Sequence, residues 1–252
     1  MIDLTDKIAL VTGGSRGIGR ACCLKFAQAG ADVAIGYNAN HAAAESVLAE
    51  IRSLGRSAIG VAGNIADRQT LEHLFSTARK TFGRVDIVVA NAGIWKRGPI
   101  EELSEEEWRQ TIDVNLTSAF RTCQLAAREM KPLKQGKIIL VSSTAGQRGE
   151  AHYSHYAASK GALIAFTKSL AAELGPWNIH VNCVAPGWVT TDMSAEILEI
   201  QEERAKIEQL TPLRRIATAD DIAGPILFLA SSLSDQVQGE VLNVNGGSVL
   251  CG

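Results

Sequence analysis

Several features that would mark a specialised class of protein are missing from this sequence. Acidic and basic residues nearly balance, 27 against 25, and they are scattered, so there is no basic stripe for a nucleic acid and no polybasic membrane anchor. No apolar run approaches the ~20 residues that cross a membrane. Cysteine is scarce and odd in number, without CxxC or zinc-like spacing, which is typical of reduced thiols in a core. The five are Cys22, Cys23, Cys123, Cys183 and Cys251.

The amino terminus carries two acidic residues within Met1–Asp6, where a secretory signal would carry a basic segment. We therefore expect a soluble, cytoplasmic protein with small-molecule partners, and neither a nucleic acid nor a membrane as a partner. A chain of 252 residues suits one large domain, which can bury about three quarters of its unfolded surface. We expect a single domain over residues 1–252, because no linker, repeat or low-complexity tract interrupts it.

What the sequence does contain is a regular alternation of short apolar runs with longer amphipathic ones. The short runs are continuously apolar, as in strands buried on both faces of a parallel sheet. Such strands, joined by right-handed helical crossovers, form the doubly wound α/β Rossmann fold. We predict a seven-stranded parallel sheet with helices on both faces, its strands being Ile8–Val11, Val33–Ile35, Ala58–Val61, Ile87–Ala90, Ile138–Val141, Val181–Val184 and Val241–Val244.

The first crossover contains a glycine-rich turn between the strand Ile8–Val11 and a predicted helix Ile18–Ala29. Glycines at this place allow close backbone approach, so that a pyrophosphate can lie against the helix N-terminus. A tight turn without a ligand would use the same residues, but the position after the first strand favours dinucleotide binding. The predicted cofactor contacts in the turn are Gly13, Ser15, Arg16, Gly17, Ile18 and Gly19.

Tyr156 and Lys160 lie four residues apart in a helical run that continues to Leu174, so both side chains share one helix face. A free tyrosine titrates near pH ~10, and a nearby lysine cation lowers its pKa. Lowering that pKa to about 7 requires roughly 4 kcal/mol, more than one exposed lysine supplies. The pair indicates proton transfer only if a second positive charge and exclusion of water act with it; otherwise it is a solvated helix face.

The turn has the spacing TGxxxGxG, and from this point the sequence resembles the short-chain dehydrogenase/reductase family. Further motifs of that family follow in the expected order and cover almost the whole chain: Asn91-Ala92-Gly93, Asn115, Ser143, the pair Tyr156 and Lys160, and Pro186-Gly187. The similarity is strongest to the β-ketoacyl-[acyl-carrier-protein] reductases, through Val184–Met193 and Val244–Gly247. The resemblance implies an NAD(P)-dependent oxidoreductase that reduces a ketone to a secondary alcohol.

The resemblance also implies the catalytic residues. Tyr156 would donate the proton, and Lys160 would lower its pKa and hold the nicotinamide ribose. Ser143, thirteen residues before Tyr156, would bind the carbonyl oxygen, with Ser142 as the alternative. Asn115 would hold a water in a proton relay to the lysine. An asparagine at a helix kink could equally serve to hydrogen-bond backbone groups that the kink leaves without partners.

The choice between NADP(H) and NAD(H) depends on charge near the adenosine ribose. Asp32 lies about 20 residues after the glycine turn, the distance at which NAD binders carry an acidic residue. However, it precedes the second strand, whereas the ribose lies beyond that strand's carboxyl end. There the chain reads Gly36-Tyr37-Asn38, without a carboxylate, and Arg16 matches a basic position of NADP-using relatives. We expect NADP(H), with NAD(H) as the alternative.

The remaining cofactor contacts are expected at the ends of later strands. Asn91–Gly93 could also be an ordinary strand-ending turn, and Pro186–Thr191 resembles the family loop that fixes the nicotinamide amide. The set is Tyr37, Asn38, Asn64, Ile65, Asn91, Ala92, Gly93, Pro186, Gly187, Val189 and Thr191, together with Tyr156 and Lys160.

The substrate mouth is expected to contain Ser143, Trp95, Tyr153 and Trp188. Tyr153 is not a second catalytic phenol, because the residue four positions later is alanine. His152 and His155 lack a companion carboxylate at ligand spacing, so no metal is expected. The charged segment Ser194–Gln209, within a lid region of about 190–212, predicts a mobile helix over the site, although a solvated surface helix would read the same.

Three functions remain open from the sequence. A 3-oxoacyl-[acyl-carrier-protein] reductase is favoured by the resemblance, and basic docking residues would then be expected; Lys134 fits one place, but Trp177 occupies the other. A polyol, sugar or small-ketone dehydrogenase is the alternative, and a non-catalytic NADP-sensing protein is a third.

The apolar helix Ala119–Met130 resembles the family's dimer surface, from which we expect a homotetramer.

Overall fold

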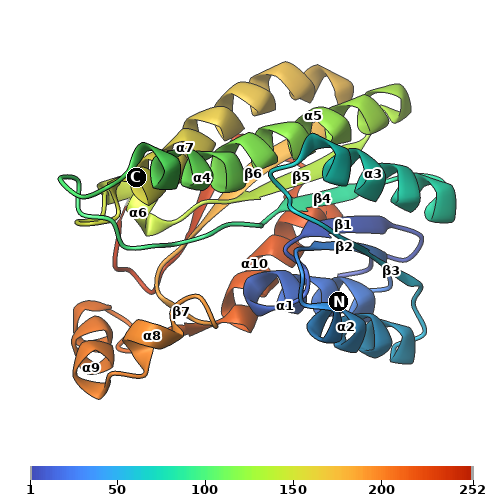
Figure 1. Ribbon diagram of the computed structural model, residues 1–252. Helices are drawn as coiled ribbons and strands as arrows, with labels where there is room; N and C mark the ends of the chain where they lie inside the picture. The colour runs from blue at the N-terminus through green and yellow to red at the C-terminus, as the bar shows by residue number, and fades with distance from the viewer. Residues whose placement is uncertain (1, 251–252) are drawn as a thin grey trace.

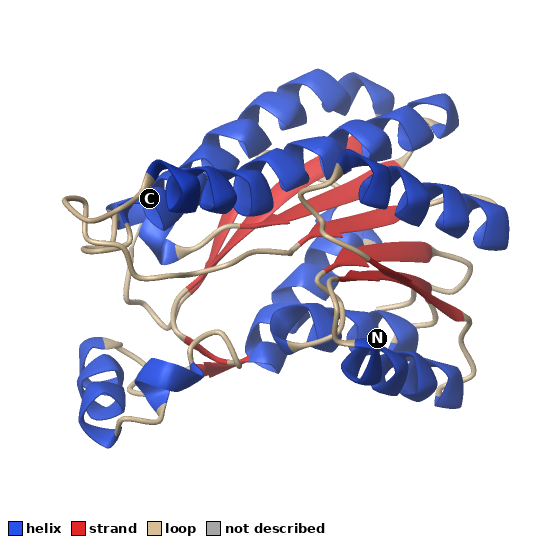
Figure 2. Cartoon of the chain, viewed as in Figure 1, coloured by secondary structure: helices blue, strands red, loops and turns tan. Residues whose placement is uncertain are grey.

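The computed structural model describes residues 2–250 and confirms the predicted fold. Seven strands form one parallel sheet in the order β3-β2-β1-β4-β5-β6-β9. Figure 2 shows this sheet between two layers of helices. The strands are β1 Ile8–Thr12, β2 Asp32–Tyr37, β3 Ala58–Ala62, β4 Ile87–Ala90, β5 Gly136–Val141, β6 Ile179–Pro186 and β9 Val241–Val244.

Helices cover both faces of the sheet (Figure 1). The helices α1, α2 and α10 pack on one face, and α3, α5 and α7 pack on the other. The helix α4 is joined to α5 by one π-helical turn, Asp113–Thr117. The bounds are α1 Gly17–Gln28, α2 His41–Ser53, α3 Arg68–Phe82, α4 Glu105–Ile112, α5 Ser118–Met130, α6 Thr144–Arg148, α7 Ser154–Leu174 and α10 Ala219–Ala230.

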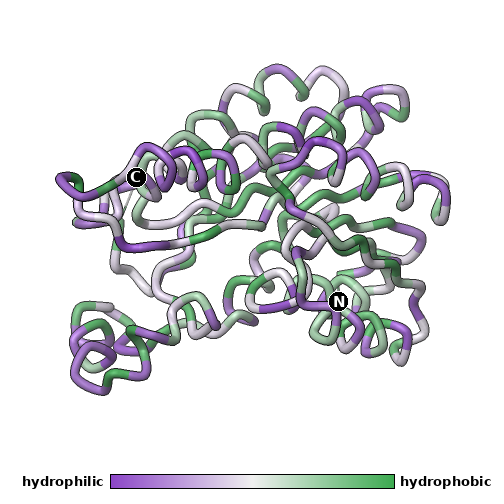
Figure 3. The backbone as a smooth tube through the Cα atoms, viewed as in Figure 1, coloured by the Kyte–Doolittle hydropathy of each residue, from purple (hydrophilic) through white to green (hydrophobic). Residues whose placement is uncertain are grey.

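The apolar strands are buried because a helix layer covers each side of them. All five residues of β1 and all four of β4 are buried. Figure 3 shows the hydrophobic colouring running along these strands through the middle of the molecule. Continuous apolar runs therefore predicted the sheet correctly, since neither face of a central strand meets water.

Two helices begin with a reciprocal pair of side-chain to backbone hydrogen bonds. The Ser104 side chain accepts a hydrogen bond from the Glu107 amide (3.2 Å), and the Glu107 carboxylate accepts one from the Ser104 amide (3.1 Å). This reciprocal pair starts α4 by satisfying two amides that have no partner inside the helix. Thr218 and Asp221 form a second such pair at the start of α10.

The segment Ser194–Gln209, predicted to be helical, is helical in two pieces. The structure has two helices there, α8 Ala195–Leu198 and α9 Gln201–Leu210, because Ile200 is extended and interrupts the helix. They follow the short strand β7, Val189–Thr190, which pairs with β8, Ala217–Thr218. This segment projects from the body of the sheet (Figure 1), and its predicted mobility stays a prediction.

The sheet order reverses beside β1, which lies between β2 and β4. Because ligands of doubly wound sheets bind outside the carboxyl ends of the strands at such a reversal, the site is expected at this edge. The cysteines Cys22, Cys23, Cys123 and Cys183 are free and buried, and Cys251 lies outside the described residues. No helix within residues 2–250 is both long and apolar enough to cross a membrane.

Candidate active site

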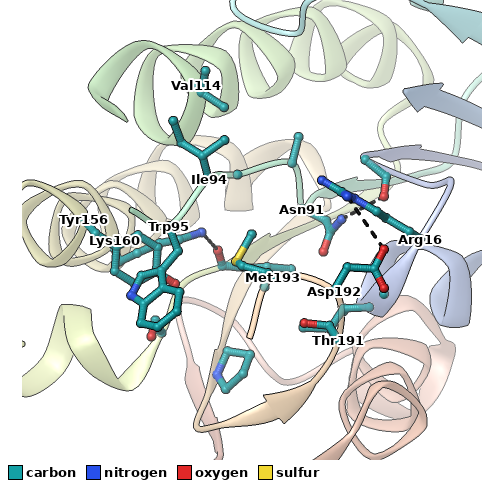
Figure 4. Close-up of a pocket in the computed structure, with 18 of the residues that line it drawn as sticks. Arg16, Asn91, Ile94, Trp95, Val114, Tyr156, Lys160, Thr191, Asp192 and Met193 are labelled. Atoms are coloured by element: carbon teal, nitrogen blue, oxygen red, sulfur yellow. Dashed lines mark hydrogen bonds and ion pairs between the residues drawn. The ribbon is translucent and has the colours of Figure 1, made fainter. Parts of the chain in front are cut away.

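A cavity of about 750 Å³ opens at the carboxyl edge of the sheet. It brings together turns and loops that follow β1, β2, β3, β4, β5 and β6. In Figure 4, Arg16, Asn91 and Asp192 lie at one end, and Trp95, Tyr156 and Lys160 lie at the other. We call the first the dinucleotide end and the second the substrate end.

The glycine turn forms the wall of the dinucleotide end. Gly13 and Gly17 have φ angles of 69° and 53°, in the left-handed region that favours glycine. Asn91 fastens the turn to β4, because its side-chain amide donates to the carbonyl oxygens of Thr12 (2.9 Å) and Gly13 (3.3 Å). Gly19 lies behind the turn instead of on the cavity wall, and a Cβ there would meet the Gly13 carbonyl oxygen. Its role is packing.

The predicted residues after the second and third strands lie where expected. Tyr37, Asn38, Asn64 and Ile65 all line the cavity. Asp32 does not, since it sits at the opposite end of β2, where its carboxylate pairs with the Arg56 guanidinium (2.9 Å). The structure therefore agrees that Asp32 is no ribose ligand.

Arg16 is exposed on the cavity wall, and its guanidinium pairs loosely with the Asp192 carboxylate (3.7 Å). This partner was missed from the sequence, because 176 positions separate the two residues. A second missed contact joins the Tyr37 hydroxyl to His41 Nδ1 (3.1 Å) at the start of α2.

The loop after β6 also faces the cavity, through Pro186, Gly187, Val189 and Thr191. Ser194, which was not predicted, orders this loop: its hydroxyl donates to the Val189 carbonyl (2.5 Å) and accepts from the Thr191 amide (3.2 Å). A Cβ on Gly187 would lie 3.0 Å from Asn245 Cα, so only glycine fits there without displacing backbone.

Tyr156 and Lys160 share the inner face of α7, not a solvated one. Lys160 is 4% exposed, and its ammonium donates to the Val141 carbonyl (2.8 Å) at the end of β5. The ammonium lies 5.7 Å from the centre of the Tyr156 ring. Burial lowers the pKa of Lys160 to about 8, because the charged form loses hydration.

The expected low pKa of Tyr156 is not found in the protein alone. Burial raises the pKa of the phenol to about 12, while the Ser143 side chain acts in the opposite direction. Lys160 does not overcome this effect by itself. The structure thus agrees with the sequence argument that a further positive charge is needed before the phenol can transfer a proton near neutral pH.

The choice between the two serines follows from their contacts. Ser142 is 3% exposed, and its hydroxyl donates to the Lys160 carbonyl (2.7 Å), which ties β5 to α7. Ser143 starts α6, accepting from the Ala145 amide (3.1 Å), and acts on the Tyr156 phenol. Both serines line the cavity, and these contacts favour Ser143 as the residue that acts with the phenol, which stays a prediction.

Asn115 lies in the π-helical turn between α4 and α5, a distortion often found at functional sites. Its side chain exchanges hydrogen bonds with the Ile94 amide (2.8 Å) and carbonyl (2.9 Å), and also donates to Ser159 Oγ (3.1 Å). A Cβ on Gly93 would lie 3.3 Å from Asn115 Oδ1 and 3.5 Å from Lys160 Nζ. The amide is thus near the lysine, but behind the cavity wall.

The substrate end is built around three aromatic rings. Trp95 stacks on Tyr153 (centroids 4.5 Å apart, 7° between planes) and meets Trp188 edge to face (5.5 Å, 89°). Trp95 and Trp188 line the cavity, whereas Tyr153 stands outside its wall and supports Trp95. Glu150, also on the wall, was missed because no motif marks it.

The two histidines of this loop do not enter the cavity wall. His152 is exposed with φ of 65°, and His155 is buried beside Gly98 with its Nδ1 unpaired. Among residues 2–250, no three histidine, cysteine, aspartate or glutamate side chains gather as metal ligands would. The absence of a metal stays a sequence-based prediction.

The fold and the site define a class of dinucleotide-binding oxidoreductases, and comparison with known proteins agrees. Residues 13–248 match the sequence model of a short-chain dehydrogenase family described as enoyl-(acyl carrier protein) reductase. The chain is 38% identical to a Synechocystis 3-oxoacyl-[acyl-carrier-protein] reductase over 99% of its length and 100% of that protein. It is 40% identical to a Sphingomonas L-rhamnose 1-dehydrogenase (NAD(P)(+)) over 97% and 96%.

Among solved structures, one assigned as a gluconate dehydrogenase from Agrobacterium tumefaciens superposes with a TM-score of 0.94. Its sequence is 35% identical, with 98% of both chains covered. The chain therefore belongs to the short-chain dehydrogenase/reductase family and is an oxidoreductase of that class. Its relatives act on several kinds of alcohol or ketone, so family membership leaves the substrate open.

Proposed function

We propose that the protein is an NADP(H)-dependent oxidoreductase that interconverts a ketone and a secondary alcohol. The observation that supports this most directly is the convergence of Ser143, Tyr156 and Lys160 on one cavity with the glycine turn. Gly13 and Gly17 have no side chains, which lets a dinucleotide approach the backbone of the turn, and the cavity extends from that turn to the phenol.

The chain's own residues position the substrate and move one proton. Ser143 donates a hydrogen bond to the substrate oxygen, and the Tyr156 hydroxyl gives that oxygen its proton during reduction. Lys160, fixed by the Val141 carbonyl, holds its ammonium beside the phenol throughout. The nicotinamide, when bound, supplies or accepts the hydride. Asn115 orders the strand-end backbone at Ile94 and takes part in proton relay to Lys160.

Because the pKa of Tyr156 is raised in the protein alone, the bound cofactor must bring positive charge close to the phenol. Moving the pKa of Tyr156 from about 12 to about 7 needs roughly 7 kcal/mol, at ~1.36 kcal/mol per pKa unit. The protein alone does not supply it, although the Lys160 ammonium lies 5.7 Å from the centre of the Tyr156 ring. A cationic ring bound against the loop Pro186–Thr191 would contribute to it, in a cavity from which it displaces water.

The preference for NADP(H) is supported by the charge at the dinucleotide end. The wall after β2 consists of Tyr37, Asn38, Ala39 and Asn40, which offer hydrogen bonds and no negative charge. Arg16 can leave its loose pair with Asp192 to meet a 2′-phosphate. Comparing KM for NADPH and NADH with one ketone tests this proposal, and equal values would overturn it.

Two substrate classes are candidates, and the geometry favours the second. A carrier-bound 3-oxoacyl thioester is suggested by the whole-chain similarity. However, the expected docking place holds the exposed Trp177, whose ring centroid lies 5.5 Å from the Lys131 ammonium, and the Glu150 carboxylate lies in the substrate end. A free polyol, sugar or small ketone therefore suits the cavity better. Turnover of an acetoacetyl thioester against a hydroxyketone separates the two.

The same assay separates an enzyme from an NADP-sensing protein. Cofactor fluorescence should decrease with time on adding a ketone; binding without turnover would indicate a sensor.

We further propose a cytoplasmic homotetramer. Support comes from exposed apolar side chains on the outer helices, Trp108 at 41% and Phe120 at 43% exposed, which a partner subunit would cover. Sedimentation velocity measures the assembly.

A further inference from the structure

The substrate end contains one acidic side chain that the proton-transfer mechanism does not use. Glu150 lies in the loop between α6 and α7 and lines the cavity. The indole Nε1–H of Trp95 donates a hydrogen bond to Glu150 Oε2 (3.3 Å). The carboxylate is partly buried, and this burial raises its pKa, although Arg148 at the same mouth acts in the opposite direction.

The aromatic rings hold this carboxylate in place. Trp95 is fixed by Tyr153 stacked behind it and by the edge contact with Trp188. A tryptophan with two aromatic neighbours has little freedom to turn, so its N–H presents a defined partner to Glu150. One carboxylate oxygen is thereby engaged, while the other can accept hydrogen bonds from a ligand in the cavity.

The chemistry of a partly buried carboxylate then limits the ligand. Against an unsubstituted acyl chain, Glu150 would lose hydration without gaining a hydrogen bond, which is unfavourable. Against hydroxyl groups it would gain charge-assisted hydrogen bonds, while the apolar faces of Trp95 and Trp188 pack on C–H groups. Against a second carboxylate it would meet like charge.

We propose that Glu150, held by Trp95, makes the site selective for neutral polyhydroxylated substrates, its carboxylate accepting hydrogen bonds from hydroxyl groups beside the reacting carbon. This rests on the proposed function and names the substrate class for it. Selection of this kind is strong, because a site built to hydrogen-bond a hydroxyl group rejects analogues that lack it.

Glu150 has a second, measurable effect on the catalytic phenol. Its charge is one of the causes that raise the pKa of Tyr156, after burial. The groups that face Glu150 are Trp95, Arg148, Tyr153 and Tyr156. Removing the negative charge should therefore shift the pH profile of alcohol oxidation toward lower pH, which a merely structural residue would not do.

The test compares three groups of alcohols with NADP⁺: neutral polyols and sugars (xylitol, sorbitol, L-rhamnose), hydroxyl-poor alcohols (cyclohexanol, 2-octanol) and a sugar acid (gluconate). The wild type should have its highest kcat/KM in the first group. Glu150→Gln should lower that kcat/KM about 100-fold, mainly through KM, and change the hydroxyl-poor group less than about threefold. Glu45→Gln, at an exposed carboxylate of α2 outside the cavity wall, is the matched control and should change neither.

The outcomes separate the two proposals. If the wild type oxidises or reduces none of these compounds and no thioester, the proposed function fails. If it prefers hydroxyl-poor alcohols or gluconate, or if Glu150→Gln lowers all groups equally, the role of Glu150 is wrong while the function stands. Trp95→Phe keeps an aromatic ring but removes the N–H donor, so it should reproduce part of the selective loss. It also guards against misfolding of the first variant, and an unchanged preference in both variants overturns the role.

Discussion

The two ends of the cavity are built by different means. At the dinucleotide end the wall is largely backbone, shaped by glycines and fastened by Asn91. At the substrate end it is made of large side chains, Trp95, Trp188 and Glu150, from three separate loops. A cofactor that never changes can be recognised by backbone geometry, whereas a substrate that differs between relatives is recognised by side chains, which can change without disturbing the sheet.

Tyr156→Phe should have the largest effect, and only at the substrate end. Without a hydroxyl proton, kcat should fall about 1,000-fold, while dinucleotide affinity should stay within about threefold, because the ring is kept. Stopped-flow turnover and fluorescence titration of NADPH measure the two. Tyr153→Phe is the matched control: its ring stands outside the cavity wall, so its kcat should stay within a fewfold. Equal losses in both variants would contradict the assignment of Tyr156.

Lys160 lies between the two ends, and its burial has a cost that depends on pH. Its pKa is about 8 in the folded protein against ~10.4 when unfolded, so at pH 7 both states are charged and folding bears the full penalty. From pH 8 to about 10.4 the folded form loses the proton first, and wild type should gain about 3 kcal/mol of stability relative to Lys160→Met.

Urea denaturation of both cofactor-free proteins at pH 7, 8, 9 and 10 measures this difference. Ionisation of Cys22, Cys23 and Cys123 occurs in both proteins and cancels. The Lys160 charge lowers the pKa of the Cys183 thiol, but burial raises that pKa to about 11, so Cys183 stays mainly protonated in the folded state over this range. The matched control is Lys168→Met, an exposed lysine on the same helix, whose difference from wild type should not change over this range. If the stability difference between wild type and Lys160→Met also stays constant from pH 7 to 10, the Lys160 ammonium is hydrated in solution and its pKa is not lowered.

Gly19→Ala should damage the dinucleotide end alone. The added Cβ would meet the Gly13 carbonyl oxygen and lie 2.7 Å from Asn91 Nδ2, so the turn must move. We expect NADPH affinity to fall about 100-fold, near 2.7 kcal/mol, by fluorescence titration. Gly224→Ala in α10, where an added Cβ meets nothing within 4 Å, should leave affinity unchanged and stabilise the fold by about 0.5–1 kcal/mol. Undiminished affinity in Gly19→Ala would mean that the turn can relax.

Arg16 is the exception at the dinucleotide end, because we propose that this side chain recognises the cofactor by its charge. Arg16→Ala should raise KM for NADPH about tenfold and leave KM for NADH nearly unchanged. Asp192→Asn, which frees the guanidinium, should lower KM for NADPH by a smaller factor. Steady-state kinetics with both cofactors measures the two. Parallel changes for NADPH and NADH would show that Arg16 does not distinguish them.

Much of the site could be predicted from the sequence because its motifs lie at the ends of predictable strands. Ser143, Tyr156, Lys160 and the glycine turn fall on the cavity for that reason. The lid was predicted less well: charge pattern gave a helix, but the extended backbone at Ile200 that divides it has no sequence signal. The pKa of Tyr156 was also beyond the sequence, since burial raises it, and burial depends on the packing of α7 against the sheet.

The sequence alone determined the parallel sheet, the place of the glycine turn and the position of Tyr156 and Lys160 on one helix face. Continuous apolar runs and residue spacing act within short stretches of chain, so local periodicity is enough to reveal them. Only the tertiary structure decided that Asp192 meets Arg16, that Ser142 supports Lys160, and that Trp95 holds Glu150 in the cavity. Each of these contacts joins separate loops or elements, and only the folded sheet brings them within hydrogen-bonding or ion-pairing distance.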